Sequence, residues 1–431
     1  MKTATPKIEA PPFTQLRKAV FGGSHSMKTK LYVLILLSLI LAGSGLAQES
    51  RPLAERQQEF LSWKFGMFIH FNVATFNERQ WASGYEDPAT FAPTQLDCGQ
   101  WADAAKAAGM KYAVLTVKHT GGWCLWDSQY TAHDITALTN YHQGKGDLVR
   151  EFVDAFRARG LKVGLYYCMP GDFSHRANNR LLPGQTDLHG LPPEAADDYA
   201  GFIKKQLTEL LTRYGPVDLM WFDQVKNKYT RAQWLEIKAH VQSLQPNCLV
   251  IANNSTDFKE TDIHSYEYPF LKSRKSGKEL PPEKNTNASE VCDCITPGAW
   301  FWETNLNEES VTSAADLVDM LKLCNSRQAN YLLNVPPDRT GRLPEMFVQR
   351  LKEIGQRLQE SEKPWTMHKI DNEMYNHNSL SPGDVNGDGD LDIINSNSDW
   401  NTRAAEKHVV WHENPGIASP DQTKEWPQHM I

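Results

Sequence analysis

The sequence lacks the metal-site patterns that cysteine-rich folds use. It contains no Cys-x-x-Cys pair and no grouping of cysteine with histidine at zinc-ligand spacing. It also lacks an excess of basic residues, because 45 lysines and arginines stand against 52 aspartates and glutamates, for a net charge of -7. Nucleic-acid-binding surfaces are usually basic, so the charge balance argues against a nucleic-acid partner.

No apolar run is long enough to span a bilayer. The strongest one follows Lys28 and Lys30 and extends from Leu31 to Ala42, about twelve residues where a membrane helix needs about twenty. Small residues then continue to Ala47, in the pattern of a signal-peptide cleavage site. We therefore expect residues 1–47 to be an N-terminal extension and signal peptide. The mature protein is expected to be secreted or periplasmic, with no membrane partner after cleavage.

Cysteines are few, and their number is odd. Seven cysteines in an exported chain leave at least one thiol free or paired between chains. Cys292 and Cys294 are too close in sequence to suggest an ordinary pair. We expect the cysteines to be mostly small buried hydrophobic residues, with one disulfide at most.

Apolar segments and amphipathic segments alternate from about residue 55 to residue 359. A Gly-rich phosphate turn is missing after the first apolar segment, where the chain reads HFNVATF, which disfavours an open dinucleotide-binding sheet. Eight strands separated by helices over about 300 residues predict a (β/α)8 TIM-like barrel, assigned to residues 52–362. Strands are predicted at 64–71, 111–119, 161–169, 216–223, 248–253, 262–268, 295–302 and 330–335, and helices at 97–109, 146–160, 195–215, 231–244, 314–327 and 344–360.

Carboxylates, histidines and aromatic residues gather where the predicted strands end. Barrel enzymes carry their working residues at these carboxyl ends. Asp223 stands out because it directly follows the apolar residues MWF, and a carboxylate there is costly unless it is solvated or hydrogen-bonded in a cleft. Paired carboxylates with aromatic platforms are typical of glycoside hydrolysis, and thirteen tryptophans favour a carbohydrate ligand. The other candidates are His70, Asn72, Lys118, His119, Tyr166, Tyr167, Tyr266, Glu267, Glu290, Trp300 and Trp302.

Five motifs together resemble the α-L-fucosidases of glycoside hydrolase family 29. They are KFGMFIHFN, KYAVLTVKHTGGWCLWDSQYT, GDLVREFVDAFRARGLKVGLYY, VDLMWFD and NYLLNVPPDRTG, within residues 55–360. The resemblance implies a (β/α)8-like barrel that removes terminal α-L-fucose with retention of configuration and without a cofactor for catalysis. It implies fucosylated oligosaccharides, glycoproteins or polysaccharides as substrates.

The resemblance also implies roles for individual residues. Asp223 matches the nucleophile, and His70, Trp81, His119 and Tyr167 match positions that contact the sugar. Trp300 is a further candidate, as a wall for the sugar's methyl group, with Trp302 as the alternative. The acid/base is expected to be Glu290, in SEVCDCITPGAWFW, with Glu267, in SYEYPF, as the alternative.

Three positions depart from the family pattern. Family members read KHHDGF where this chain reads KHTGGW, so Thr120 and Gly121 replace a histidine and an aspartate, and Gln80 precedes Trp81 where an acid is common. Losing a group that holds a sugar hydroxyl should change specificity or weaken binding. Two alternatives therefore stay open: a carbohydrate-binding barrel without activity, and a retaining glycosidase for a related sugar such as an α-galactoside.

The chain changes character after Lys363. Acidic and amide side chains alternate around Gly389, which is the ligand spacing that suits Ca²⁺. With the later VVWHENPG, this segment resembles an FG-GAP/VCBS-type repeat, so residues 363–431 are predicted to be a partial β repeat with a possible calcium site. The expected ligands are Asp384, Asn386, Asp388, Asp390 and Asp392.

Overall fold

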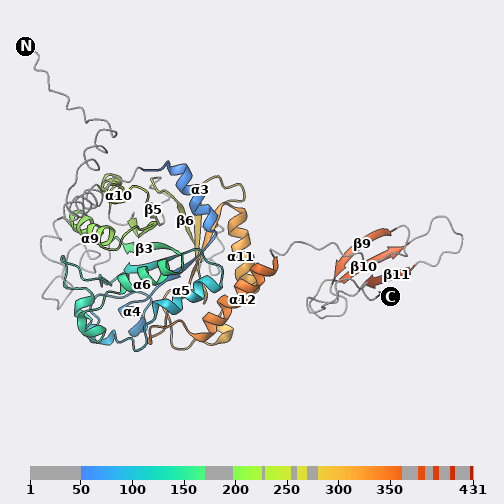
Figure 1. Cartoon of the computed structure of the whole chain (residues 1–431), viewed down its shortest axis with the longest axis horizontal. Coiled ribbons are helices and arrows are strands. Elements are labelled where there is room, and N and C mark those ends of the chain that lie inside the picture. The colour runs from blue at the N-terminus through green and yellow to red at the C-terminus, as the bar shows by residue number, and fades with distance from the viewer. Residues whose placement is uncertain are drawn as a thin grey trace, which may run out of the picture. The chain divides into compact units, whose positions relative to one another are not determined.

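A computed structural model of the chain shows two compact units, residues 1–359 and 360–431. It describes residues 50–169, 198–225, 229–253, 260–268 and 280–361, together with the backbone of four strands between residues 377 and 430 (Figure 1). The predicted extension and signal peptide, residues 1–47, lie outside the described residues. Among the helices that are described, none has the length and apolar character needed to cross a membrane.

The first unit is built on eight parallel strands. Their order in the sheet is β5-β4-β3-β2-β1-β8-β7-β6, and a parallel bridge between Ile251 and Ile263 joins the two outer strands. The ring is therefore nearly closed, which confirms the predicted (β/α)8 TIM-like barrel. The strands are β1 (Phe65–Ile69), β2 (Tyr112–Lys118), β3 (Lys162–Cys168), β4 (Leu219–Asp223), β5 (Leu249–Ala252), β6 (His264–Glu267), β7 (Ser289–Cys294) and β8 (Ala329–Asn334).

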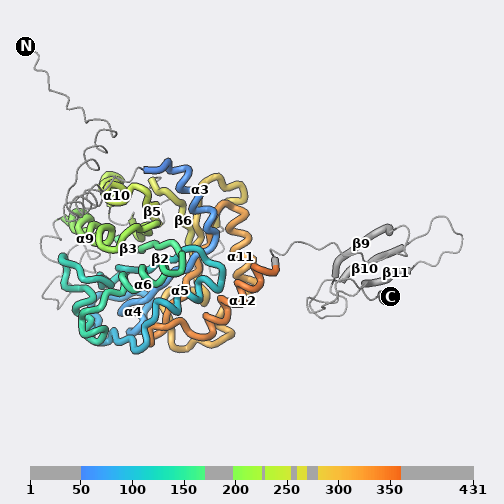
Figure 2. Tube along the Cα trace, viewed as in Figure 1, coloured from blue at the N-terminus to red at the C-terminus, as the bar shows by residue number. Residues whose placement is uncertain are grey.

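Helices surround this ring, as the Cα trace in Figure 2 shows. Several begin at an aspartate whose side chain caps the first turn: Asp97 accepts from the backbone N–H of Gln100, and Asp147 accepts from that of Arg150. The helices are α3 (Leu53–Trp63), α4 (Val73–Phe76), α5 (Cys98–Ala107), α6 (Leu148–Ala158), α9 (Tyr199–Arg213), α10 (Arg231–Leu244), α11 (Ala314–Ser326) and α12 (Glu345–Ser361).

One predicted strand is misplaced. The seventh strand was expected at residues 295–302, but β7 ends at Cys294 and the residues after it form the loop that carries Trp300. Glu290 and Asp293 interrupt the apolar pattern of SEVCDC, so this segment carries only a weak strand signal. All six residues of β7 are nevertheless buried.

The strands separate two apolar layers. Successive side chains point to opposite faces of a strand, so Met220 and Phe222 of β4 pack outward beneath the helices, while Leu219 and Trp221 pack inside the barrel. Helix α3 contributes Phe60 and Trp63 to the inner layer. These rings pack against Tyr112, the first residue of β2, so α3 covers the amino-terminal end of the barrel interior.

All seven cysteines lie in the described part of the chain, where they are buried and form no disulfide with one another. This confirms the expectation of buried small side chains, and the single disulfide allowed by the sequence is not formed.

The second unit contains an antiparallel sheet in the order β12-β11-β10-β9. Four of the five expected calcium ligands, Asp384, Asn386, Asp388 and Asp390, lie outside the described residues, and Asp392 is described only as the backbone that begins β10. The strands are β9 (His377–Gly383), β10 (Asp392–Asn397), β11 (His408–His412) and β12 (Gln428–Met430).

Candidate active site

A cleft opens at the carboxyl ends of the barrel strands. It contains six of the candidate residues, Asp223, His70, Trp81, His119, Tyr166 and Trp300, together with Glu267, which was the alternative acid. Strands β1, β3, β4 and β6 and the loops after β1, β2 and β7 thus converge on one place. The remaining lining residues are Phe68, Trp221 and Gln224.

Asp223 ends β4 with its carboxylate held by three donors. Tyr166 Oη donates to Oδ2 over 2.8 Å, while the Gln224 backbone N–H and Asn253 Nδ2 donate to Oδ1 over 2.8 and 3.0 Å. Gln224 has a φ of 56°, a left-handed conformation that turns the chain sharply after the strand. The carboxylate is therefore fixed in orientation at the cleft rather than carried on a mobile side chain.

Glu267 ends β6 and lies close to Asp223. Asn253 Nδ2 donates to Glu267 Oε2 over 3.1 Å and to Asp223 Oδ1 over 3.0 Å, so one amide group contacts both carboxylates. Ser265 Oγ donates to Asn253 Oδ1 over 3.0 Å, which fixes the amide with its NH₂ toward the acids. Two hydrogen bonds of ordinary geometry from one nitrogen place the two accepting oxygens, Asp223 Oδ1 and Glu267 Oε2, about 5 to 6 Å apart.

Glu290, the expected acid/base, is not brought into the cleft. It is the second residue of β7, at the amino-terminal end of the strand, and it is fully buried. Tyr112 Oη and Trp221 Nε1 donate to its two oxygens over 2.6 and 2.8 Å. Burial raises the pKa of Glu290 to about 7, against the opposing effect of these donors. The family resemblance placed Glu290 ahead of an aromatic strand, whereas in the structure it lies inside β7.

Tyr167, predicted to contact the sugar, points away from the cleft. It belongs to the outer apolar layer, where its hydroxyl donates to Gln206 Oε1 over 2.6 Å. The neighbouring Tyr166 points inward and lines the cleft. Neighbouring residues of a strand point to opposite faces of the sheet, so only one of the two tyrosines can face the cleft, and it is Tyr166 instead of the expected Tyr167.

His70 is buried, and its hydrogen-bond network defines its tautomer. Its Nδ1 lies 2.7 Å from Asn334 Oδ1, while Asn334 Nδ2 donates to the Trp300 carbonyl over 2.8 Å. The amide oxygen can only accept, so Nδ1 carries the hydrogen and Nε2 is left as an acceptor. Burial lowers the pKa of His70 to about 3, against the effect of Asn334, so the ring is neutral near pH 7.

His119 stacks near Tyr166 at a ring-centroid distance of 5.5 Å, and its Nδ1 lies 3.2 Å from Thr120 Oγ1. Thr120, one of the departures from the family pattern, therefore contacts a histidine that lines the cleft. It is itself fully buried, at 1% exposure.

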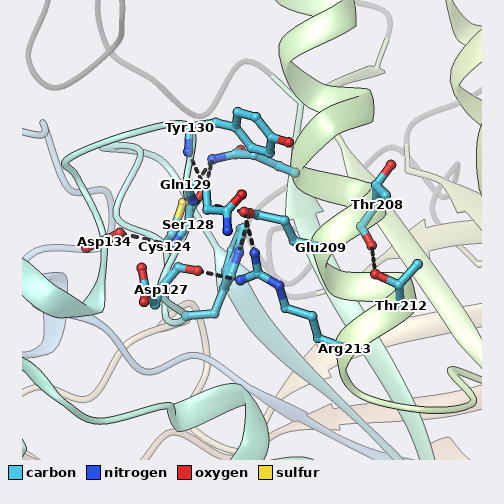
Figure 3. Close-up of polar contacts among 12 residues, drawn as sticks. Cys124, Asp127, Ser128, Gln129, Tyr130, Asp134, Thr208, Glu209, Thr212 and Arg213 are labelled. Carbon is cyan, nitrogen blue, oxygen red and sulfur yellow. Dashed lines mark hydrogen bonds and ion pairs between the residues drawn. The ribbon is translucent and has the colours of Figure 1, made fainter.

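The segment after His119 is anchored to α9 by a buried acid. Glu209 accepts from Trp126 Nε1 over 2.8 Å and from the Gln129 backbone N–H over 2.9 Å. Arg213 pairs with Glu209 over 2.9 Å and also donates to the Asp127 carbonyl (Figure 3). Since Glu209 is only 4% exposed, this pairing fixes the loop behind His119 to the helix.

Trp81 lies on the rim of the cleft and is 50% exposed. The preceding Gln80 ties its loop to the loop after β7: Gln80 Oε1 accepts from the backbone N–H groups of Trp300 and Phe301 over 2.7 and 3.0 Å. Gln80 Nε2 donates to Glu303 Oε1 over 2.8 Å. The amide therefore sets the two tryptophan-bearing loops against each other.

Gly121, the second departure, is required by packing. Its φ is 98°, and a Cβ atom there would lie 2.8 Å from Ala82 Cβ and 3.1 Å from the Gly84 nitrogen. An aspartate at this position would collide with the loop that carries Trp81. The glycine thus lets the loops after β1 and β2 approach closely.

Sequence reasoning missed Asn253 as a link between the acids, and Phe68, Trp221 and Gln224 as lining residues. Trp221 was recognisable in principle, because it lies two residues before Asp223 on the same face of β4. Asn253 carried no such signal: it is an ordinary amide after β5, and only the closed ring brings it to β4 and β6.

The site can be compared with known proteins. The family model described as Alpha-L-fucosidase matches residues 45–363. "Alpha-L-fucosidase 1" of Arabidopsis thaliana is 29% identical over 328 residues, covering 71% of this chain and 60% of that protein. A relative from Oryza sativa subsp. japonica is 32% identical over 316 residues, covering 68% of this chain and 57% of its own length. The chain thus spans about three fifths of the length of these plant relatives.

Solved structures are also similar. A glycoside hydrolase 29 family member from an unknown rumen bacterium has a TM-score of 0.58 and 26% identity, over 79% of this chain and 61% of that one. The Lactobacillus casei alpha-L-fucosidase AlfC, solved with alpha-L-fucose product, has a TM-score of 0.57 over 72% of this chain and all of its own, at 24% identity, and supports the fold. The family match covers most of the sequence, so the chain belongs to the alpha-L-fucosidase family.

Proposed function

We propose that the protein is a retaining exo-α-L-fucosidase that removes terminal α-L-fucose from glycans, with Asp223 as nucleophile and Glu267 as acid/base. The observation that carries this proposal is the pair of carboxylates joined through Asn253 at the open end of the barrel. Their separation of about 5 to 6 Å suits retention, which needs about 5–5.5 Å, better than inversion, which needs room for a water between the acids.

In the first step Asp223 attacks the anomeric carbon, and the bond to the leaving group breaks. Glu267 gives its proton to the departing oxygen, so the leaving saccharide departs as a neutral alcohol. The product on the enzyme is an ester between fucose and Asp223. In the second step Glu267 takes a proton from water, whose oxygen attacks the same carbon and displaces Asp223, so configuration is retained after two inversions.

The remaining cleft residues are proposed to bind the sugar. Neutral His70 presents Nε2 as an acceptor for one sugar hydroxyl, because Asn334 holds the hydrogen on Nδ1. Trp300 and Trp81 present aromatic surface, which suits the apolar face and methyl group of a 6-deoxy sugar.

The decisive experiment is hydrolysis of a chromogenic α-L-fucoside followed by proton NMR of the first sugar released. We expect α-L-fucose before mutarotation. First release of the β anomer would rule out retention. The same panel should include an α-galactoside and fucosylated oligosaccharides: activity on the galactoside alone would move the specificity to that sugar, and binding without turnover would favour a binding barrel.

We also propose that residues 1–47 direct export and that residues 363–431 form an FG-GAP/VCBS-like calcium-binding segment. The support is the basic and apolar pattern of the N-terminus and the alternating acids from Asp384 to Asp392. N-terminal sequencing of the exported protein tests the first proposal. Calcium titration of the full chain, compared with an Asp388→Ala Asp390→Ala variant, tests the second.

A further inference from the structure

A buried acid beneath the cleft is left unused by the proposed mechanism. The side chain of Glu290 lies inside the barrel, where each of its two oxygens accepts one hydrogen bond. The donors come from two other strands, Tyr112 on β2 and Trp221 on β4. Burying a carboxyl group in an apolar interior is costly, so its place between these two donors calls for a physical reason.

The upper donor, Trp221, belongs to the floor of the cleft. Its indole lines the cavity and packs on Tyr166 with ring centroids 5.3 Å apart and planes 23° apart. Tyr166 in turn donates to the Asp223 carboxylate over 2.8 Å. The orientation of the Trp221 ring therefore bears both on the surface that meets the sugar and on the tyrosine that holds the nucleophile.

The lower donor, Tyr112, is firmly seated. Its ring lies against Gly66, where a Cβ atom would be 2.4 Å from the ring, and packs on Phe60 and Trp63 of α3. An acid bonded to this tyrosine is anchored from below. Glu290 thus links the firmly packed Tyr112 to the Trp221 ring above it through two hydrogen bonds.

Trp221 needs such a partner because its ring is almost fully buried and carries one polar hydrogen. An indole N–H without an acceptor is strongly disfavoured in an apolar interior. With Glu290 as acceptor, the ring orientation that points Nε1 downward is selected over its flipped alternative.

We propose that Glu290 is a positioning residue that fixes the Trp221 indole as the floor of the sugar-binding cleft and, through the ring contact with Tyr166, supports the orientation of Asp223. It does not touch the substrate. The kinetic part of this proposal rests on the proposed fucosidase function, while its structural part does not.

Two substitutions separate positioning from charge. Glu290→Gln keeps an oxygen for the Trp221 N–H, and its NH₂ group can donate to the Tyr112 hydroxyl oxygen, so the bridge survives without ionisation. Glu290→Leu removes both bonds at similar volume. Leu332→Ala is the matched control. It disturbs the same inner apolar layer, but it removes no hydrogen bond to Trp221.

The measurements are kcat and KM for an aryl α-L-fucoside and the Kd of a fucose-configured iminosugar, at a temperature where every variant is folded. We expect Glu290→Leu to lose about tenfold or more in kcat/KM and to raise Kd by a similar factor, because ground-state and transition-state binding both use the floor. Glu290→Gln and Leu332→Ala are expected to stay within about threefold of the wild type. Glu290→Leu should add little further loss once Trp221→Phe has removed the indole N–H.

The proposal is overturned if Glu290→Leu affects kcat/KM no more than Leu332→Ala, if Glu290→Gln is as impaired as Glu290→Leu, or if azide rescues Glu290→Ala, which would make the residue the acid/base. A wild type without fucosidase activity would sink the proposed function alone. In that case the test is the indole N–H NMR signal of Trp221, assigned with Trp221→Phe. Glu290→Leu must shift this signal and speed its hydrogen exchange, and an unchanged signal overturns the proposal.

Discussion

Asp223 and Glu267 share one hydrogen-bond donor, the side-chain nitrogen of Asn253, at 3.0 and 3.1 Å. The shared amide sets the spacing between the two acids and holds their orientation toward one another. Its own orientation is fixed by Ser265, which donates to the amide oxygen over 3.0 Å. The separation that decides between retention and inversion thus depends on a neutral residue that takes no part in the chemistry.

Replacing the nucleophile tests the first role. Asp223→Ala should lower kcat by at least about a thousandfold, because no carboxylate remains to form the glycosyl ester. Added azide should restore turnover by attacking from the vacated face, and the product should be the inverted fucosyl azide, detectable by NMR.

Asp293→Asn is a suitable control for this variant. Asp293 is also a buried acid, but it accepts from Tyr331 Oη over 2.9 Å and is absent from the cleft lining. Its replacement should reduce stability and leave kcat within about threefold. Full turnover by Asp223→Ala would remove Asp223 from the mechanism.

The second test separates Glu267 from Glu290. Glu267→Ala should slow substrates with poor leaving groups far more than aryl fucosides with good ones, because only the former need a proton on the departing oxygen. Azide should then give the retained fucosyl azide. Glu290→Ala should show neither the leaving-group dependence nor the rescue, and the opposite pattern would restore Glu290 as the acid/base.

The barrel and the position of Asp223 at the end of a strand in the cleft were predictable because both follow from local pattern. A continuous apolar strand that ends in an acid identifies a strand end regardless of its partners, and VDLMWFD is such a strand. Depth in the barrel was less predictable. Glu290 was expected in the cleft, but β7 begins at Ser289, so Glu290 lies near the opposite end of the strand. Tyr167 was also expected there, but on β3 it is Tyr166 that points into the barrel.

Contacts between residues far apart in the sequence could not be predicted at all. Asn334 pairs with His70 across 264 residues, and Gln80 contacts Trp300 across 220. Amides are common in loops, so nothing in their sequence neighbourhood marks these two. Only ring closure of the sheet determines which amide meets which partner.

The departure at Gly121 predicts a packing effect. Gly121→Ala should destabilise the protein by about 2 kcal/mol or more, because the new methyl group meets Ala82 and Gly84 in a left-handed conformation. Displacement of the Trp81 loop should also raise KM.

Gly160→Ala is the matched control. Gly160 has a φ of 74° and no atom within 4 Å of a new Cβ, so the substitution should cost about 1 kcal/mol and leave KM unchanged. Urea denaturation and kinetics measure both, and equal effects of the two variants would contradict the packing argument.

Gln80 predicts a charge effect at the cleft rim. Gln80→Glu keeps the oxygen that accepts from Trp300 and Phe301, but it places a second oxygen where Nε2 now donates to Glu303 over 2.8 Å. The two carboxylates should repel one another, loosening the loops, with a loss of about 1 kcal/mol and a higher KM. Adding Glu303→Gln should restore much of the loss, and added salt should weaken the effect of the single variant. A single variant that behaves like the wild type at low salt would exclude this role for the amide.

Two buried groups predict opposite dependences of stability on pH. The pKa of Glu290 is raised from 4.5 to about 7 by burial, so its contribution to folding is complete below about pH 4.5 and is lost as the pH rises through 7. The pKa of His70 is lowered from 6.5 to about 3, so its contribution is complete above about pH 6.5 and is lost as the pH falls through 3. Together these two groups favour the largest free energy of unfolding at mildly acidic pH, between about pH 4.5 and pH 6.5.

Replacing either residue should weaken the dependence of the unfolding free energy on pH on one side of this range. Glu290→Gln removes the ionisation that opposes folding at high pH. Relative to the wild type, it should therefore gain up to about 3 kcal/mol of unfolding free energy between pH 4.5 and pH 8, the equivalent of the shift to about 7. His70→Gln should leave the dependence at high pH unchanged and reduce the loss of stability between pH 6.5 and pH 4. Urea unfolding of the three proteins at several pH values measures both slopes. If the free energy of unfolding varies with pH in the same way for the wild type and Glu290→Gln, Glu290 keeps an ordinary pKa. Water would then reach its carboxyl group between Tyr112 and Trp221 more readily than its burial indicates.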